Sequence, residues 1–399
     1  MARFLFAWEL GQGLGHLVRY KALISALIDD GHEVFYLARD GHKVRLVNPQ
    51  AQIQVGVIHP EFIQAQKRLD DPHLASYATL LFNCGFSDGG KIATRVRHWL
   101  GLFNEIKPDC IISDHSPTAV LANRISGYPI VLAGNGFTLP PAEYPLRLYH
   151  HEQFESAARN TQFEKELCDL INASMHQVSP TVREICHLRD LLIADQSWLM
   201  TFEELDCYGQ RDQASYFGTF PNESFGVEFE WPEMPGPRIF MYLHSGKGGE
   251  ELANWARDKS ASLCVVMPNV PQQVRRVFDP SQTHFAEHPV KFSKIAAEVD
   301  LGVTNGSANS LANLVLAELP QLALPVSMEN YMEARRLEIV GCGLMTTGPN
   351  FAAVGEKLDQ LLCEPSYGLA ARSLAKRYAR SDVMTQTMSL QHKLYELVG

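Results

Sequence analysis

The sequence predicts an α/β protein with two doubly wound, Rossmann-like domains that face each other across a cleft. Short apolar runs alternate with helical patterns from the first residue onward, as a parallel sheet with crossover helices requires. Near the middle, residues 221–237 are rich in proline and show no periodicity, and the alternation then restarts at Ile239. With 399 residues, the chain is also longer than one hydrophobic core usually holds.

The first half opens with one βαβ unit. Phe4–Trp8 reads as a buried strand, residues 16–30 as an amphipathic helix, and Glu33–Ala38 as the second strand. The long connection 61–106 mixes aromatic and polar residues, which indicates inserted helices that cap a cleft. Further strands are expected at Gln52–Ile58, Cys110–Ser113, Pro129–Leu132, Ser197–Thr201 and Ser215–Gly218.

The second half repeats the pattern. A helix is expected near Glu250–Lys259, another at Leu311–Ala317, and helical segments from Phe351 to the end. Strands are expected at Ile239–Leu243, Leu263–Met267, Thr283–Phe285, Leu301–Thr304 and Gln321–Leu324. These patterns predict a first domain at 1–220, a linker at 221–237, a second domain at 238–380 and a C-terminal helix at 381–399 that can cross back to the first domain.

Composition narrows the function classes. The formal net charge is −10 and no run of Lys and Arg occurs, so we expect no nucleic-acid partner. The eight cysteines form no C-x-x-C pair and no metal-ligand spacing, which is typical of reduced thiols in a cytoplasmic protein. No apolar stretch reaches about 18 residues, so no membrane span is expected, and the acidic charge gives no support for membrane association.

A glycine-rich turn, Gly11–His16, follows the first strand and opens a helix. In this setting backbone N–H groups and the helix N-terminus favour an anion or ligand site, to which Gly13 and Gly15 would contribute. The turn is nearly a dinucleotide fingerprint, and Asp40 lies where a ribose-binding acid would sit, so an oxidoreductase remains an alternative. In the plainest alternative the glycines serve only the turn and His16 only caps the helix.

Asp114 is the expected partner of His16. It ends the strand that begins at Cys110, at the carboxyl edge of the same sheet, where a carboxylate can orient an imidazole as a general base. Asp109 competes for this role, but it precedes the strand and should lie at the opposite edge. The alternative is that Asp114 is a solvated loop acid.

In the second half, a small Gly/Ser-rich turn follows the strand Leu301–Thr304. The turn Asn305–Ser310 precedes a helix and is suited to a diphosphate leaving group without a metal. Glu329 and Asn330 follow the next strand and can hydrogen-bond a polyol. Ser245 and Lys247 lie in another glycine-rich turn, which lacks the spacing of a P-loop, and Lys247 is either a phosphate contact or simply solvated.

With these residues identified, the chain resembles the GT-B glycosyltransferases, in particular the group that includes bacterial natural-product sugar transferases and UDP-glucuronosyltransferases. Gly15-His16 with Gly31-His32-Glu33-Val34 is similar to the "GH…L…L…GHEV" opening of that family, and residues 303–320 are similar to its "VTHGGxNSxxEAL…GxP" donor motif. The resemblance implies that His16 is the catalytic base and Asp114 its partner. It also implies that the domain at 1–220 binds the acceptor and the domain at 238–380 binds the nucleotide sugar. The residues it implies for donor binding, with those expected above, are Gly13, Gly15, Ser245, Lys247, His288, Val290, Asn305, Gly306, Ser307, Ala308, Asn309, Ser310, Asn313, Glu329 and Asn330.

The departures from the family pattern concentrate on the donor side. Asn305 replaces the histidine that contacts the diphosphate, Ser307 replaces the second glycine, and Asn313 replaces the ribose-binding glutamate. We expect an inverting, metal-independent transfer from a nucleotide-diphosphate sugar of the UDP or dTDP type, with no other cofactor, to an apolar or aromatic hydroxyl acceptor held near residues 61–99 and 137–149. The departures keep two alternatives open: a degenerate protein that binds nucleotide, glycan or partner without catalysis, and a nucleotide-sugar isomerase.

Overall fold

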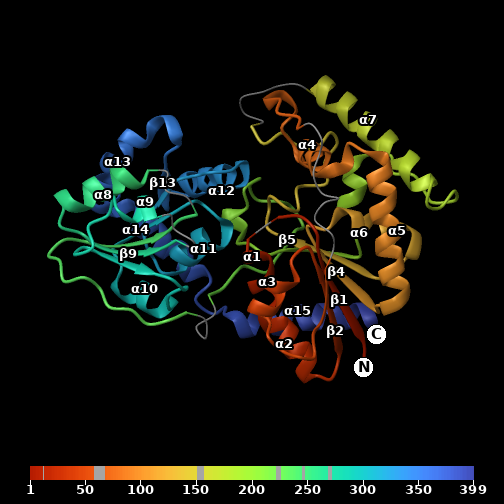
Figure 1. Cartoon of the computed structure of the whole chain (residues 1–399), viewed down its shortest axis with the longest axis horizontal. Coiled ribbons are helices and arrows are strands. Elements are labelled where there is room, and N and C mark those ends of the chain that lie inside the picture. The colour runs from red at the N-terminus through yellow and green to blue at the C-terminus, as the bar shows by residue number, and fades with distance from the viewer. Residues whose placement is uncertain (12, 58–67, 151–156, 222–225, 245–247, 268–271) are drawn as a thin grey trace. The chain divides into compact units, whose positions relative to one another are not determined.

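The computed structural model describes all residues except 12, 58–67, 151–156, 222–225, 245–247 and 268–271 (Figure 1). It divides into two compact units. Unit 1 consists of residues 1–200, 211–217 and 384–399, and unit 2 of residues 201–210 and 218–383. Each unit is built on one parallel sheet with helices on both faces, which confirms the predicted fold class.

The sheet of unit 1 has the order β3-β2-β1-β4-β5-β6-β7, and every pairing in it is parallel. Its strands are β1 (Arg3–Trp8), β2 (Glu33–Ala38), β3 (Gln54–Val57), β4 (Cys110–Asp114), β5 (Ile130–Gly134), β6 (Gln196–Leu199) and β7 (Ser215–Tyr216). The order reverses between β1 and β4, so the segments that leave the carboxyl ends of these two strands lie side by side.

Both faces of this sheet are buried, which explains why β1 is a continuous apolar run. Leu5 and Ala7 belong to one core cluster, together with residues of α5 (Gly89–Ile106), α6 (Pro117–Ser126) and α7 (Ala157–His176). Phe4, Phe6 and Trp8 belong to the other, together with residues of α2 (Lys21–Asp29) and α3 (Gly41–Val47).

The predicted helix 16–30 is two helices, α1 (Gly15–Val18) and α2, because the backbone leaves helical geometry at the buried Tyr20, with φ −103° and ψ −1°. The long connection after β3 does contain helices: η2 (Pro72–Leu74), α4 (Tyr77–Leu81), the π turn η3 (Phe82–Phe86) and α5. η4 (Leu188–Leu192) precedes β6.

The last helix, α15 (Val383–Val398), completes unit 1. Leu390 and Leu394 are fully buried in the cluster that holds Phe4 and Phe6. Asp30, at the end of α2, accepts hydrogen bonds from the Gln391 amide and the Tyr395 hydroxyl at 3.0 and 2.6 Å. Figure 1 shows α15 beside α2 and β2.

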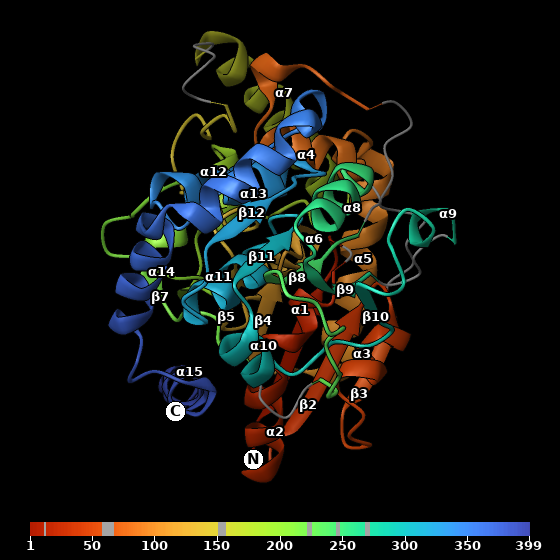
Figure 2. The ribbon, with the colours of Figure 1, turned by 90° about the vertical axis from the view of Figure 1, so that its left-hand side faces the viewer.

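The sheet of unit 2 has the order β10-β9-β8-β11-β12-β13 and is also entirely parallel. Its strands are β8 (Arg238–Tyr242), β9 (Ser262–Val266), β10 (Thr283–Ala286), β11 (Leu301–Thr304), β12 (Gln321–Ala323) and β13 (Gly343–Met345). Its helices are η5 (Glu203–Leu205), α8 (Gly249–Asp258), α9 (Gln272–Arg275), α10 (Phe292–Glu298), α11 (Ala308–Leu316), α12 (Met328–Ile339), η6 (Gly348–Ala353), α13 (Val354–Cys363) and α14 (Pro365–Arg377). Figure 2 shows several of these helices from the side.

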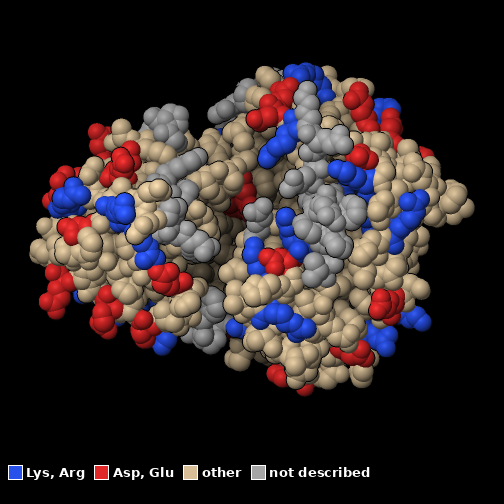
Figure 3. Space-filling model, viewed as in Figure 1, with Lys and Arg blue, Asp and Glu red and all other residues tan. Residues whose placement is uncertain are grey.

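The described part of the proline-rich segment expected as a linker, residues 226–237, packs within unit 2. Val227 forms a parallel bridge with Val290, the Pro232 carbonyl accepts a 2.7 Å hydrogen bond from Ser262, and Phe229 is buried in a core cluster. On the face shown in Figure 3, acidic and basic side chains are interspersed and the described residues form no continuous basic patch (Figure 3). Among the described helices, none combines the length and apolar character needed to cross a membrane.

Candidate active site

The candidate site of unit 1 lies where β1 and β4 end. These strands pair in parallel with Trp8 opposite Asp114, so the glycine-rich turn after β1 and the last residue of β4 meet at one edge of the sheet. The turn leads directly into α1, which carries His16 in its first turn. Sheet topology therefore brings together two residues that are 98 positions apart in the sequence.

His16 and Asp114 form a buried hydrogen-bonded pair. The His16 Nδ1 atom lies 2.9 Å from Asp114 Oδ1, and the exposed fractions of the two residues are 8% and 2%. This burial contradicts the alternative of a solvated loop acid. Asp109 lies at the opposite edge, as expected, where its carboxylate accepts a 2.7 Å hydrogen bond from the Arg3 backbone.

The charge on Asp114 is stabilised by its neighbours. Burial opposes ionisation, but His16 and Arg19 together hold the pKa of this carboxyl below its usual range. Arg19 Nη1 lies 3.9 Å from Asp114 Oδ2. Burial, followed by the negative charge of Asp114, raises the pKa of Tyr20 well above its ordinary value. Asp114 is therefore an ionised acceptor that favours the Nδ1–H tautomer of His16 and leaves Nε2 able to take a proton.

Gly11 keeps the space beside His16 Nε2 free. Its φ is +91°, and a Cβ atom added to it would lie only 2.5 Å from Nε2. The Trp8 ring stacks on the His16 ring with a centroid separation of 5.3 Å and an interplanar angle of 22°. The His16 ring is thus held by Asp114 through a hydrogen bond and by Trp8 through packing.

The other candidate residues of this part of unit 1 are Gly13, Gly15 and Asp40. Gly15 is the first residue of α1, and its carbonyl accepts a 3.0 Å hydrogen bond from Arg19 Nε. Gly13 lies in the turn itself, and the nearest atom to a Cβ placed there would be Gly15 N at 3.8 Å. Asp40 caps α3 by accepting a hydrogen bond from the Lys43 backbone at 3.1 Å, so its carboxylate already serves a helix.

In unit 2, Asn305 is buried, and both its amide oxygen and its amide nitrogen bond the backbone. Its Oδ1 accepts a 2.5 Å hydrogen bond from the His244 N–H, and its Nδ2 donates a 2.8 Å hydrogen bond to the Leu324 carbonyl. The exposed fraction of Asn305 is 2%. The side chain therefore ties together the segments that follow β8, β11 and β12.

The rest of this turn approaches α12. Gly306 has φ +81°, and a Cβ there would lie 2.9 Å from the Asn330 carbonyl oxygen, so only glycine allows this contact. Ser307 is the N-cap residue of α11, which begins at Ala308, and its hydroxyl bonds that of Ser310 at 2.8 Å. Glu329 and Asn330 lie in the first turn of α12, and the structure thus brings the two predicted donor segments together.

The remaining donor candidates do not form one group. Asn309 Oδ1 accepts a hydrogen bond from Thr219 at 3.3 Å, and Asn313 is half-buried on α11 with no described partner for its Oδ1. Val290 is a core residue packed with Phe229, and His288 is exposed. Ser245 and Lys247 lie outside the described residues.

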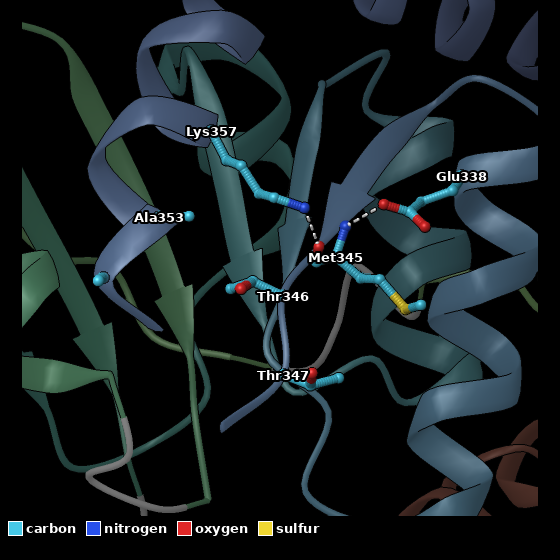
Figure 4. A pocket seen from close by; sticks show the side chains of 7 residues that line it. Glu338, Met345, Thr346, Thr347, Ala353 and Lys357 are labelled. Atoms are coloured by element: carbon cyan, nitrogen blue, oxygen red, sulfur yellow. Dashed lines mark hydrogen bonds between the residues drawn. The ribbon is translucent and has the colours of Figure 1, made fainter. Parts of the chain in front are cut away.

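The sequence did not mark one pocket of unit 2. It has a volume of about 470 Å³ at the end of β13, and Figure 4 shows its lining (Figure 4). Its two charged side chains are both bonded to Met345, since Glu338 accepts from the Met345 N–H at 2.8 Å and Lys357 donates to the Met345 carbonyl. These contacts fix the short edge strand.

The comparisons with known proteins agree with this architecture, although no family model matches the chain. A curated relative from Mycobacterium tuberculosis, a PGL/p-HBAD biosynthesis glycosyltransferase, is 21% identical over 294 residues, which cover 69% of this chain and 68% of the relative. Similar solved structures include the glycosyltransferase VinC in complex with dTDP, with a TM-score of 0.70, 17% identity and 99% of both chains covered.

Two further structures are similar over nearly their whole length. The calicheamicin glycosyltransferase CalG4 has a TM-score of 0.73 at 14% identity, covering 100% of this chain and 98% of its own. The spinosyn rhamnosyltransferase SpnG, complexed with the spinosyn aglycone, has a TM-score of 0.64 at 15% identity, covering 98% and 99%. The predicted resemblance is confirmed: the chain has the GT-B fold and is similar in sequence and structure to enzymes that transfer sugars.

Proposed function

We propose that this chain is an inverting, metal-independent glycosyltransferase that moves a sugar from a nucleotide-diphosphate sugar to a hydroxyl group of a small-molecule or lipid acceptor. The observation that carries the proposal is the buried pair of His16 and Asp114, with its 2.9 Å hydrogen bond at the carboxyl edge of β1 and β4. A protein that only binds nucleotide or glycan has no need of a base held by a buried carboxylate.

His16 acts as the general base. With Nδ1–H donated to Asp114, Nε2 takes the proton of the acceptor hydroxyl while its oxygen attacks the anomeric carbon. The bond from that carbon to the phosphate oxygen breaks, and its electron pair leaves with the nucleoside diphosphate. Attack from the side opposite the leaving group inverts the anomeric configuration. Asp114 stabilises the imidazolium that forms.

In this proposal, unit 2 binds the nucleotide-sugar donor. The turn Gly306–Ser310 places backbone N–H groups at the N-terminus of α11, which can neutralise a leaving diphosphate without a metal. Glu329 and Asn330, next to Gly306, are placed to hydrogen-bond the sugar. Because VinC is described in complex with dTDP, a donor of the dTDP or UDP type is the first to test, with no other cofactor.

In this proposal, unit 1 binds the acceptor. Phe137 and Tyr149 stack with a ring separation of 5.0 Å, and Tyr77 lies close to the site on α4. This aromatic environment supports an apolar or aromatic acceptor. All eight cysteines are free thiols, which supports a reducing, cytoplasmic location.

The first experiment is a thermal-shift panel with UDP, dTDP, GDP, ADP, CDP and their sugar conjugates. A ligand at about a hundred times its Kd adds roughly 2.7 kcal/mol of stability, which a melting curve resolves. With the nucleotide sugar selected in this way, His16→Ala should lower turnover by about 10²–10⁴ without abolishing donor binding. Exposed His42 on α3 gives the matched control His42→Ala. Equal turnover of the two variants would exclude His16 as the base.

Asn305 favours one second candidate, a GT-B protein that binds nucleotide or glycan without transfer. The buried amide of Asn305 already bonds the backbone of His244 and Leu324. Asn305 also stands where the resemblance expects a histidine that contacts the diphosphate. A nucleotide that stabilises the chain without any sugar transfer, hydrolysis or isomerisation would support this candidate against the transferase.

A further inference from the structure

His115 is a second buried imidazole beside the proposed base. It follows Asp114 at the end of β4 and adopts a φ of +48°, in the left-handed region that non-glycine residues seldom occupy. Its carbonyl accepts a 2.9 Å hydrogen bond from Leu10 in the turn after β1. The backbone of His115 is therefore locked between the two strand ends that form the site.

The ring of His115 extends a row of aromatic side chains. It lies 6.3 Å from the His16 ring at an angle of 21°, and 6.0 Å from the Tyr77 ring on α4. The Trp8 ring also stacks on His16. His115 thus lies next to both the proposed base and α4, a helix of the long connection after β3.

The two ring nitrogens of His115 have no partner among the described residues. The residue is 8% exposed, and neither Nδ1 nor Nε2 finds a hydrogen-bond partner in the described part of the chain. Burying an imidazole without hydrogen bonds costs free energy that a phenylalanine ring of similar shape does not. Packing alone thus gives no reason for a histidine here, and both ring nitrogens are available to a bound molecule.

Protonation does not remove this requirement. Burial is the main cause that lowers the pKa of His115 to about 3, followed by the interaction with His16; Asp114 opposes the shift, and Arg19 adds a smaller lowering. The ring is neutral near pH 7 and offers one donor and one acceptor. A neutral ring can bind an oxygen atom beside His16 without a charge that would disfavour protonation of the base.

We propose that His115 is a specificity-determining residue that hydrogen-bonds a second oxygen of the acceptor, next to the hydroxyl that His16 deprotonates. The inference rests on the proposed transferase function and deepens it. It defines the acceptor class as molecules in which the reacting hydroxyl has a neighbouring hydroxyl or carbonyl oxygen, such as a diol, a hydroxyketone or a catechol.

The test compares catechol with phenol as probe acceptors in His115→Phe and the unaltered protein, with the sugar donor selected by thermal shift. The unaltered protein should use catechol with a kcat/KM about tenfold above that of phenol, the effect of one hydrogen bond. His115→Phe keeps a ring in place. Its kcat/KM for catechol should fall about tenfold, while its kcat/KM for phenol stays unchanged, so the preference is lost. His115→Asn, which tolerates the backbone conformation and can hydrogen-bond, should retain part of it.

The outcomes separate this inference from the function on which it rests. If the unaltered protein transfers sugar to both probes and His115→Phe changes both rates by the same factor, His115 has a structural role only, or bonds an enclosed water, and the inference is wrong. If the unaltered protein transfers to neither probe and does not hydrolyse the selected donor, the proposed function itself fails. Donor affinity, measured by calorimetry, should be the same in all three proteins.

Discussion

The contact between Gly11 and His16 predicts that one added methyl group disables the site. In Gly11→Ala, the new Cβ would lie 2.5 Å from His16 Nε2, well inside van der Waals contact, so the imidazole has to move. Movement weakens the 2.9 Å hydrogen bond to Asp114, a charge-assisted bond worth roughly 1.5–3 kcal/mol. We therefore expect turnover to fall by about 10²–10⁴, as for loss of a general base.

The backbone cost of this substitution can be separated from its effect on the base. Alanine at the φ of Gly11, +91°, costs roughly 1–2 kcal/mol in folding stability wherever it occurs. Gly127, at the end of α6, has a comparable φ of +72°, and a Cβ added there meets nothing within 4 Å. Gly127→Ala is thus the matched control: it carries the backbone cost and leaves His16 untouched.

Steady-state transfer rates and thermal melting of the two variants complete the experiment. Both melting temperatures should fall by a few degrees, since about 1 kcal/mol corresponds to roughly 2–4 °C in a unit of this size. Only Gly11→Ala should lose turnover, while its donor affinity, which the proposed function assigns to unit 2, should stay constant. Equal turnover in Gly11→Ala and Gly127→Ala would refute the assignment of His16 Nε2 as the proton acceptor.

Two further predictions follow from the carboxyl groups of unit 1. Asp114→Asn should lower turnover by about 10²–10⁴ because the amide can donate to Nδ1 and reverse the tautomer, whereas Asp109→Asn, at the other end of β4, should leave it unchanged in the same assay. Burial raises the pKa of Glu164 on α7 from 4.5 to about 7, so folding of the unaltered protein becomes less favourable as pH rises between these values. Between pH 4.5 and 7.5, the free energy of unfolding of Glu164→Gln, measured in urea, should rise relative to that of the unaltered protein by on the order of 1–3 kcal/mol. If the free energies of unfolding of the two proteins change with pH in parallel, the pKa shift of Glu164 is contradicted.

Hydrophobic patterning was sufficient to predict the sheets. Phe4–Trp8 and Leu301–Thr304 are apolar runs that only a strand buried on both faces explains, and both are strands. The edge strand Gly343–Met345 was not predicted, because a strand of three residues is too short to carry a periodicity. The break at Tyr20 was not predicted either, because neither glycine nor proline marks it in the sequence.

Within the site, the sequence predicted which residues lie at the strand ends better than it predicted the contacts of their side chains. The carboxyl-edge rule placed Asp114 beside His16 and Asp109 at the far edge, without any knowledge of the loops. Motif similarity placed Asn305 and Val290 among the donor contacts, but it could not show that the Asn305 amide bonds the backbone or that Val290 belongs to a core. His115 carried no motif, and only its burial and its unpartnered nitrogens distinguish it.

The segmental make-up of unit 1 has a consequence for synthesis. Its core includes Leu390 and Leu394, yet 166 residues of unit 2, Gly218 to Val383, are translated before them. During translation, α2 and β2 therefore emerge early and remain without part of their packing surface until α15 has been synthesised. Unit 1, which starts first, completes its core after unit 2, and a shortened chain that ends before α15 would expose apolar surface on α2 and β2.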